Sequence, residues 1–174
     1  YYRSKSAALI QLVSPLQPQK ILYVGAGSGF FSKYLLDHTT AITAWCIDPF
    51  YPKERDDIHA GKPIQYRHEC TGTDSDLVLM MDVLEHVEDD LGLINDYIAK
   101  VPSGTRFLVT VPAFQFLWSG HDVFLGHYRR YTLPGVMDLM ERAGLIVEQR
   151  AYYFGLIFPL VFTVRLLRRL LGRN

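Results

Sequence analysis

Three glycines alternate with small residues in Gly25-Ala26-Gly27-Ser28-Gly29, between an apolar run and a segment of helical periodicity. Glycine lets the backbone turn tightly and approach a ligand closely, and a helix N-terminus offers free amide donors. Dinucleotide-binding enzymes use the spacing G-x-G-x-x-G, which needs a small residue where this chain has Phe30. The spacing therefore predicts a ligand-binding loop and disfavours a pyrophosphate grip.

A carboxylate, Asp48, stands at the end of the next apolar run. It can accept hydrogen bonds from both hydroxyls of a ribose, and the adjoining Pro49 and Phe50 offer apolar surface to an adenine ring. The structural alternative is a glycine turn beside an unrelated surface aspartate. The order strand, loop, helix, strand and acid favours a nucleoside-binding site.

Candidate catalytic residues gather within residues 118–131. If the site transfers a group to a hydroxyl, a base must take the proton of that hydroxyl, and histidine is the usual choice. His121 beside Asp122, with His127 a little further on, predicts a base and the acid that orients it, so His121 and His127 are the candidate catalytic residues. The structural alternative is that the histidines cap helix ends. The same three residues lack regular metal-ligand spacing, and we expect no bound metal.

Two arginines close this segment, and two further polar residues follow a central apolar run. Arg129 and Arg130 are suited to bind a carboxylate or phosphate on the acceptor, or alternatively pair with surface acids. Glu85 and His86 are a further candidate pair, either catalytic or stabilising a turn.

The elements that must position these residues alternate between apolar runs and helical patterns. The runs predict six strands, at residues 21–24, 41–47, 64–67, 77–81, 106–111 and 145–153. An opening helix ends near Pro15 and Pro18, a short helix follows the glycine loop, and later helices cover 88–100 and a segment from the N-cap Thr132 to Gly144. This alternation is typical of an α/β fold with a mostly parallel sheet.

The composition fits one domain. Of 174 residues 49% are hydrophobic, enough for a single core, and 18 basic residues balance 18 acidic ones. This excludes disorder and argues against a nucleic-acid partner. Two cysteines, Cys46 and Cys70, cannot form a disulfide framework, which favours a reducing, cytoplasmic setting. The chain starts at Tyr1 rather than Met, which predicts a piece of a longer chain.

The glycine loop, Asp48 and the stretch Leu79–Val87 make the chain resemble the class I S-adenosylmethionine (SAM)-dependent methyltransferases, from Tyr1 to about Leu171. The resemblance implies a Rossmann-like, doubly wound fold, with helices on both faces of a mostly parallel sheet. The family's sheet normally finishes with an antiparallel strand, and we expect that strand to be missing from this sequence. It implies SAM as cofactor and S-adenosylhomocysteine (SAH) as product. Further motifs resemble a bacterial subgroup of unassigned acceptor: Pro112-Ala113-Phe114, Leu117-Trp118-Ser119 and Gly126-His127-Tyr128-Arg129-Arg130-Tyr131-Thr132.

The resemblance also assigns residues to the cofactor. Those expected to bind it are Gly25, Ala26, Gly27, Ser28, Gly29, Phe30, Asp48, Pro49, Phe50, Met81, Asp82 and Val83. The glycines would pass beneath its methionine part and Asp48 would hold its ribose. Tyr23 stands where many members carry an acid, so either the affinity is lower or Asp82 takes over that role. The expected function is methyl transfer; the alternative is a catalytically inactive module that binds SAM or SAH.

The last segment, residues 151–174, carries four arginines and no acid. Leu167, Leu170 and Leu171 share a helical face, which predicts a basic amphipathic helix lying in a membrane interface, or alternatively a helix packed on the sheet or a partner chain. The first interpretation implies a lipid-linked acceptor and a cytoplasmic protein peripheral to the inner membrane face. The second leaves a small-molecule acceptor. We expect one methyltransferase domain, 1–174, with an N-terminal helix within 1–18 and this apolar, basic tail.

Overall fold

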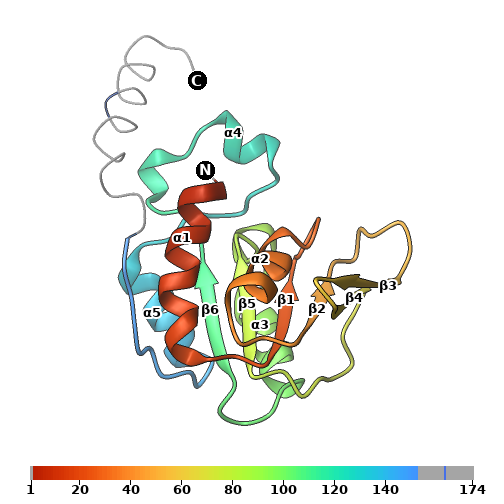
Figure 1. Ribbon diagram of the computed structural model, residues 1–174. Coiled ribbons are helices and arrows are strands. Elements are labelled where there is room, and N and C mark those ends of the chain that lie inside the picture. The colour runs from red at the N-terminus through yellow and green to blue at the C-terminus, as the bar shows by residue number, and fades with distance from the viewer. Residues whose placement is uncertain (1, 153–162, 164–174) are drawn as a thin grey trace. The chain divides into compact units, whose positions relative to one another are not determined.

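The computed structural model describes residues 2–152 and Thr163 (Figure 1). These residues divide into two compact units. The first unit comprises residues up to Val83 together with Asp96–Thr110, and the second comprises Leu84–Asn95 and the residues from Val111 onward.

The first unit contains a six-stranded sheet. Its strands are β1 (Lys20–Val24), β2 (Thr43–Ile47), β3 (Arg55–His59), β4 (Lys62–Arg67), β5 (Leu77–Met81) and β6 (Arg106–Thr110). The spatial order is β3-β4-β2-β1-β5-β6, and every neighbouring pair is parallel except β3 and β4. The prediction of an α/β fold with a mostly parallel sheet is therefore confirmed. Parallel strands end at the same edge, so the segments that follow β1, β2 and β5 begin side by side.

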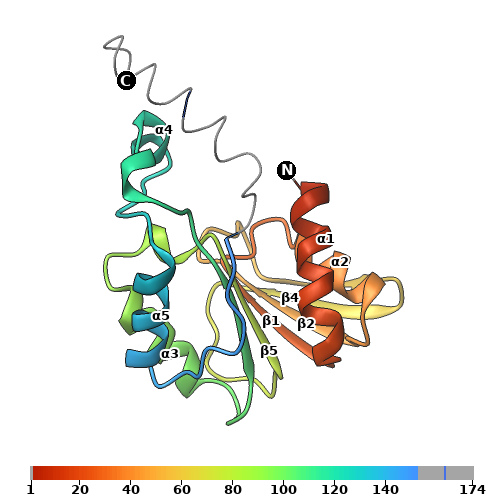
Figure 2. The same cartoon turned by 90° about the vertical axis from the view of Figure 1, so that its left-hand side faces the viewer.

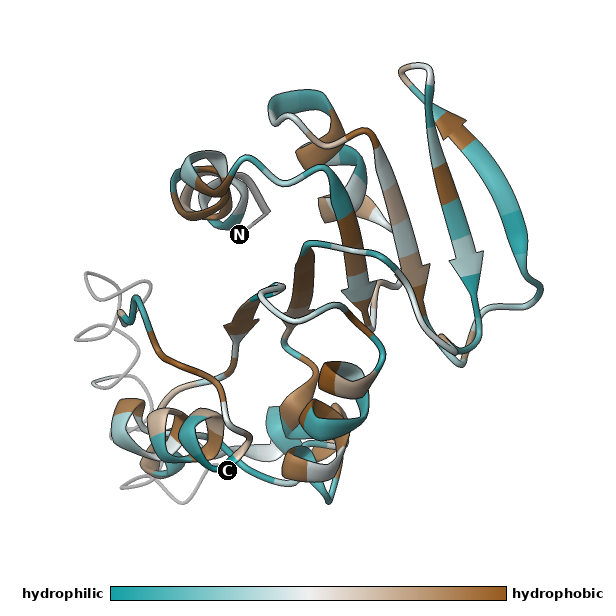
Figure 3. Cartoon of the chain, turned by 90° about the horizontal axis from the view of Figure 1, so that it is seen from below, coloured by the Kyte–Doolittle hydropathy of each residue, from teal (hydrophilic) through white to brown (hydrophobic). Residues whose placement is uncertain are grey.

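The strands β1 and β5 lie inside the sheet and are its most completely buried strands. All five residues of β5 are buried, as are four of the five in β1. Figure 3 shows β5 hydrophobic along its whole length and the edge strand β3 mostly hydrophilic. The register sets Val24 of β1 opposite Met80 of β5 and Ile47 of β2. The glycine loop, which starts directly after Val24, is thereby placed between the ends of both neighbours.

Two helices of this unit, α1 (Tyr2–Val13) and α2 (Phe30–His38), lie on one face of the sheet (Figure 2). Leu9 and Val13 of α1 and Leu35 and Leu36 of α2 are buried in one hydrophobic cluster with the strands. The last turn of α3 (Asp90–Ala99) belongs to this unit and lies on the opposite face. α1 ends where the sequence predicted, because the turn that follows it contains Pro15.

The second unit holds the start of α3, then α4 (Gly120–Phe124) and α5 (Leu133–Arg142). Thr132 caps α5 as predicted, its hydroxyl accepting a hydrogen bond from the Gly135 amide at 3.2 Å. Gly144, with a φ of +80°, follows the end of that helix.

Two strand predictions were wrong. β3 was not predicted, since its sequence, Arg-Asp-Asp-Ile-His, lacks an apolar run. It forms because Ala60 and Gly61, with φ values of +51° and +79°, make a two-residue turn that folds β3 back on β4. Conversely, residues 145–152 form no strand and pair with no strand of the described sheet. Their burial alternates only over residues 145–148, and residues 148–152 are all exposed. Tyr153 and the rest of the tail, apart from Thr163, lie outside the described residues. No helix among the described residues is long and apolar enough to cross a membrane.

Candidate functional site

The glycine loop that follows β1 combines two packed glycines with one that faces open space. Gly25 has a φ of +64°, and a Cβ there would lie 2.6 Å from Cγ2 of Val83. Gly29 has a φ of +72°, and its Cβ would lie 2.8 Å from the hydroxyl of Tyr66. At Gly27, whose φ is +51°, a Cβ would meet nothing within 4 Å. The loop is therefore held by packing at both ends and leaves its middle accessible to a ligand.

Asp48 ties this loop to the end of β2. Its Oδ2 accepts the Gly27 amide at 3.0 Å, and its Oδ1 accepts the Phe50 amide at 3.0 Å. A further bond, from the Ala26 amide to the Ile47 carbonyl at 3.1 Å, holds the two segments together. Each carboxylate oxygen has a second lone pair, so Asp48 can still accept two hydroxyl hydrogen bonds. This geometry fits a ribose diol beside a glycine loop.

The other expected cofactor residues differ in their accessibility. Ala26 and Met81 are buried, whereas Ser28 and Pro49 are exposed. The Phe50 side chain is 91% exposed and is therefore accessible to a planar ring. Phe30, the first residue of α2, is partly exposed and stacks on Tyr34.

Asp82 follows β5 in a left-handed conformation, with a φ of +56° that a residue with a Cβ rarely adopts. Its carboxylate forms an ion pair with the Lys5 ammonium and accepts the Thr110 hydroxyl at 2.9 Å. Its amide donates to the Thr110 carbonyl at 2.9 Å. Lys5 is buried, so the Asp82 carboxylate is the counter-charge of a lysine on α1. Lys5 was not predicted from the sequence, because a single lysine in an otherwise apolar helix produces no recognisable spacing pattern.

Tyr23, which stands in place of the common acid, is a core residue. Its ring is buried and packs edge-on against Phe31 with 6.3 Å between the ring centroids.

In the second unit, Asp122 and His127 form a hydrogen-bonded dyad. Oδ1 of Asp122 lies 3.0 Å from Nδ1 of His127. Asp122 is fully buried, and it also accepts the Ser119 amide at 2.9 Å and Nε of Arg130 at 2.7 Å. Burial by itself would raise the pKa of the Asp122 carboxyl, but the hydrogen bonds from Arg130, Ser119 and His127 and the Arg130 charge outweigh it and lower that pKa to about 2. An ionised Asp122 can only accept, so Nδ1 of His127 carries the proton and Nε2 is left as an acceptor.

The dyad differs from the predicted pairing. His121, adjacent to Asp122 on α4, is exposed, and its side chain forms no hydrogen bond or ion pair within the described part of the chain. Neighbouring residues on a helix point in different directions, so Asp122 orients His127 instead.

The two arginines pair with acids of the protein, as in the structural alternative, but these acids are buried or mostly buried and do not lie on the surface. Arg129 donates to Asp90 at 2.9 Å and to the Glu88 carbonyl, and Arg130 donates to Asp122 and to the Ala113 carbonyl. The prediction that they grip an acceptor anion is thus not supported by their geometry. Tyr131 donates its hydroxyl to the same Asp90 at 2.8 Å, and burial together with this bond raises its pKa, so it remains protonated.

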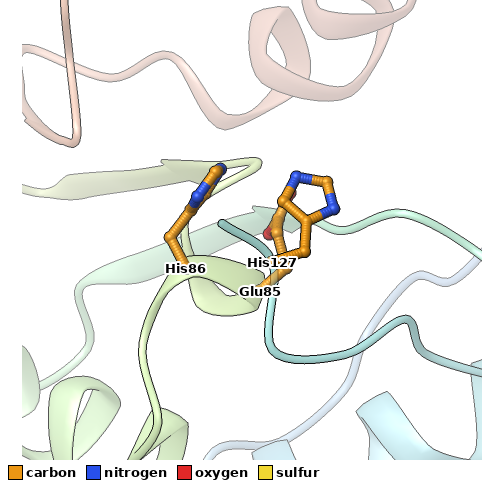
Figure 4. Close-up of side chains that lie close together, drawn as sticks. All are labelled: Glu85, His86 and His127. Carbon is orange, nitrogen blue, oxygen red and sulfur yellow. The ribbon is translucent and has the colours of Figure 1, made fainter. Parts of the chain in front are cut away.

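Glu85, His86 and His127 form a cluster in the second unit (Figure 4). One ligand atom from each lies within 4.8 Å of the others. The two imidazole rings meet edge to face with 4.7 Å between their centroids. Glu85 is buried, His127 is almost buried and His86 is exposed, so the cluster opens to solvent at one end.

Comparison with known proteins agrees with this architecture. A methyltransferase-domain family model matches residues 1–150. An O-methyltransferase family protein from Burkholderia thailandensis superposes with a TM-score of 0.61 at 15% identity, over 84% of this chain and 53% of that one. The N-methyltransferase NodS from Bradyrhizobium japonicum, in complex with SAH, gives a TM-score of 0.58 at 17% identity. The match covers 80% of this chain and 73% of NodS.

A complex of the Haloferax volcanii Trm112 methyltransferase activator with a methyltransferase gives a TM-score of 0.64 at 16% identity. The match covers 83% of this chain and 70% of that one. At these identities the structural likeness shows the fold alone. The chain spans about half the length of the Burkholderia protein. No curated protein matches the sequence.

Proposed function

The chain belongs to the class I SAM-dependent methyltransferases, and on this basis we propose that it transfers a methyl group from SAM to a hydroxyl group of a small-molecule or lipid-linked acceptor. When bound, SAM supplies an electrophilic methyl carbon on a sulfonium. The protein's own residues must then bind the nucleoside, align the acceptor and provide for the loss of its proton.

The cofactor part of the proposal is supported by the first unit. Gly27 offers open space beside the backbone, and the Asp48 carboxylate, held by two amides, can accept both ribose hydroxyls. The exposed ring of Phe50 is accessible to an adenine. We assign the residues predicted from the family resemblance, from Gly25 to Phe30, Asp48 to Phe50 and Met81 to Val83, to this site.

The choice of a hydroxyl acceptor is carried by one observation, the bond of 3.0 Å between Asp122 and His127. A buried, ionised carboxylate fixes the histidine tautomer and would stabilise positive charge on the ring, which is the arrangement that proton abstraction requires. A sulfur or amine acceptor has less need of such a group. We therefore place proton removal at the cluster of Glu85, His86 and His127 and assign no role to His121.

The test uses purified protein and SAM labelled with tritium in its methyl group. The two are incubated with extract of cells that lack the gene, and labelled products are separated and treated with mild base. An ether, the expected product, retains its label; a carboxyl ester releases labelled methanol, and a labelled amine would exclude a hydroxyl acceptor. His127→Ala should lower labelling by about 100-fold or more while the calorimetric affinity for SAH stays unchanged. Binding of SAH without any labelled product would instead indicate the inactive binding module.

A further inference from the structure

We infer that Glu85, His86 and His127 form a binding site for a divalent first-row transition-metal ion, with zinc as the reference ion. The inference deepens the proposed function, on which it rests only for the role of the ion in activating the acceptor hydroxyl. No metal was expected from the sequence, because the set considered there, His121, Asp122 and His127, lacks regular metal-ligand spacing.

Backbone structure brings these two segments together. Glu85 and His86 are consecutive in a 3-10 turn, Leu84–His86. The amide of Tyr128 donates to the Glu85 carbonyl at 2.7 Å, which holds the residue after His127 against that turn. Gly126, with a φ of +71°, turns the chain out of α4 just before His127. Main-chain geometry thus brings the two segments that carry the cluster together.

The three side chains project to the same side of their segments (Figure 4). Two ligands bound at about 2.1 Å to one ion are separated by at most about 4.2 Å. The ligand atoms of the cluster lie within 4.8 Å of one another, close to this limit, so binding an ion requires the ligands to move slightly closer together. His86 is the exposed member of the three. The other two ligands, Glu85 and His127, have buried or nearly buried side chains.

Asp122 gives His127 the tautomer that a metal requires. Oδ1 of Asp122 accepts a hydrogen bond from Nδ1 of His127 at 3.0 Å, so the lone pair that can bind a metal is on Nε2 of His127. A carboxylate bonded to the far nitrogen of a metal-binding histidine is the common arrangement around such ligands, and it fixes the ring orientation. Arg130 and Ser119 hold that carboxylate in turn, so the support extends through a third layer.

The ligand set indicates the kind of ion and its use. Two imidazoles and one carboxylate suit zinc and its neighbours, whereas magnesium and calcium prefer oxygen ligands. Three protein ligands leave at least one position open, and the exposed His86 places that opening toward solvent.

With the ion bound, Nε2 of His127 would be a ligand and no longer a base, so the ion would take over its role. It would lower the pKa of an acceptor hydroxyl bound at the open position, and the proton would pass to solvent water. The freed electron pair of the oxygen would then form the O–C bond to the methyl carbon of SAM as the C–S bond breaks, and the sulfur of SAH would keep that bond's electron pair.

The experiment uses the full chain, without an affinity tag and dialysed against EDTA, titrated with zinc chloride in a calorimeter. One zinc ion should bind per chain. His86→Ala, which removes an exposed ligand and should not disturb folding, is expected to bind it at least about tenfold more weakly. Asp122→Asn should weaken binding by about 10- to 100-fold through His127. His121→Ala is the matched control, an exposed histidine of the same unit outside the cluster, and should bind like the unmodified protein.

Cobalt provides a second measurement, since its visible spectrum reports the ligand number and should change in His86→Ala and in Glu85→Gln. Equal zinc affinity in the unmodified protein, His86→Ala and Glu85→Gln would overturn the site. If the EDTA-treated protein transfers methyl groups at the full rate, the metal ion has no catalytic role, while the proposed function stands. If one zinc ion binds but no extract component is methylated, the metal site is supported and the proposed methyl transfer is refuted.

Discussion

The ammonium group of Lys5, near the start of α1, pairs with the carboxylate of Asp82, at the end of β5, across 77 positions of the sequence. Lys5 is buried and the Asp82 side chain is 37% exposed. The pair therefore links the opening helix to the edge of the sheet at which the glycine loop lies.

Asp82→Asn should destabilise the protein, because it leaves the Lys5 ammonium buried without its carboxylate. A fully buried pair would cost about 3–5 kcal/mol; partial exposure of Asp82 reduces our expectation to on the order of 2 kcal/mol. Lys5→Met combined with Asp82→Asn should recover part of this loss. Urea unfolding of the single and double variants measures it, and strictly additive effects would show that the two groups do not interact.

Substitution of two glycines separates packing from ligand access. Gly25→Ala should lower the free energy of unfolding well beyond the roughly 1–2 kcal/mol that a left-handed backbone costs, since its Cβ would overlap Val83. Gly27→Ala should cost only the backbone strain but weaken SAH binding. Val83→Ala in the Gly25→Ala background should restore stability in part. If the denaturation curves of Gly25→Ala and Gly27→Ala coincide, the contact with Val83 is not the reason that position 25 requires glycine.

Asp48→Ala should weaken SAH binding by about tenfold or more, since each lost charge-assisted hydrogen bond is worth roughly 1.5–3 kcal/mol. Some of the effect will come through the loop, because Asp48 also accepts the Gly27 and Phe50 amides. Asp48→Asn keeps one acceptor for these amides and serves as the matched control with an intermediate affinity. Calorimetry that finds the same affinity in all three proteins would place the ribose elsewhere.

The Asp122 carboxyl should make stability depend on acidity. Its pKa in the folded protein, about 2, lies below the ordinary 3.8, so its stabilisation is present above about pH 4 and is lost as the pH falls from about 4 toward 2. The size is on the order of 2 kcal/mol at neutral pH. The stability gap between the unmodified protein and Asp122→Asn should therefore shrink between pH 6 and pH 3. Asp138→Asn, which removes an exposed pair with Arg142, is the control and should show almost no gap at either pH.

The tail gives a prediction that rests on sequence alone. Residues 151–174 carry four positive charges and no negative one, so the full chain should float with anionic liposomes. A chain ending at Phe154, which lacks all four arginines, should remain in the lower fraction. Neutral liposomes provide the control. If both chains distribute alike, the membrane interpretation of the tail and the case for a lipid-linked acceptor fail together.

Sequence patterns located the buried strands well because burial on both faces requires a continuous apolar run. β5 begins and ends at the predicted residues, 77 and 81. β3 could not be predicted in this way, since it is exposed and its side chains interact through charge. Arg55 lies over the Tyr66 ring, and Asp56 forms an ion pair with Arg67 at 2.6 Å. A strand held at the sheet edge by charges and a tight turn leaves no periodic signal.

In the candidate site, too, the residues with a local sequence pattern could be predicted, and the contacts that depend on the fold could not. Local spacing was enough to find the glycine loop and Asp48, whose hydrogen bond to Gly27 the structure shows. The partner of Asp122 could not be read from adjacency. Asp122 accepts the Ser119 amide in a capping box, and this fixes the direction of its carboxylate. Only the turn at Gly126 then decides that His127 reaches it.

The hairpin of β3 and β4 also bears on how the chain folds. It is the single antiparallel pair of the described sheet, and its partners are joined by a turn of only two residues. Every other strand pair must bring together segments separated by a whole crossover, which delays their formation because long loops are costly to close. We therefore expect this hairpin, within microseconds, to be the earliest ordered part of the sheet, and β1 with β5 to pair late. Amides of the hairpin would then gain protection first in pulsed hydrogen exchange.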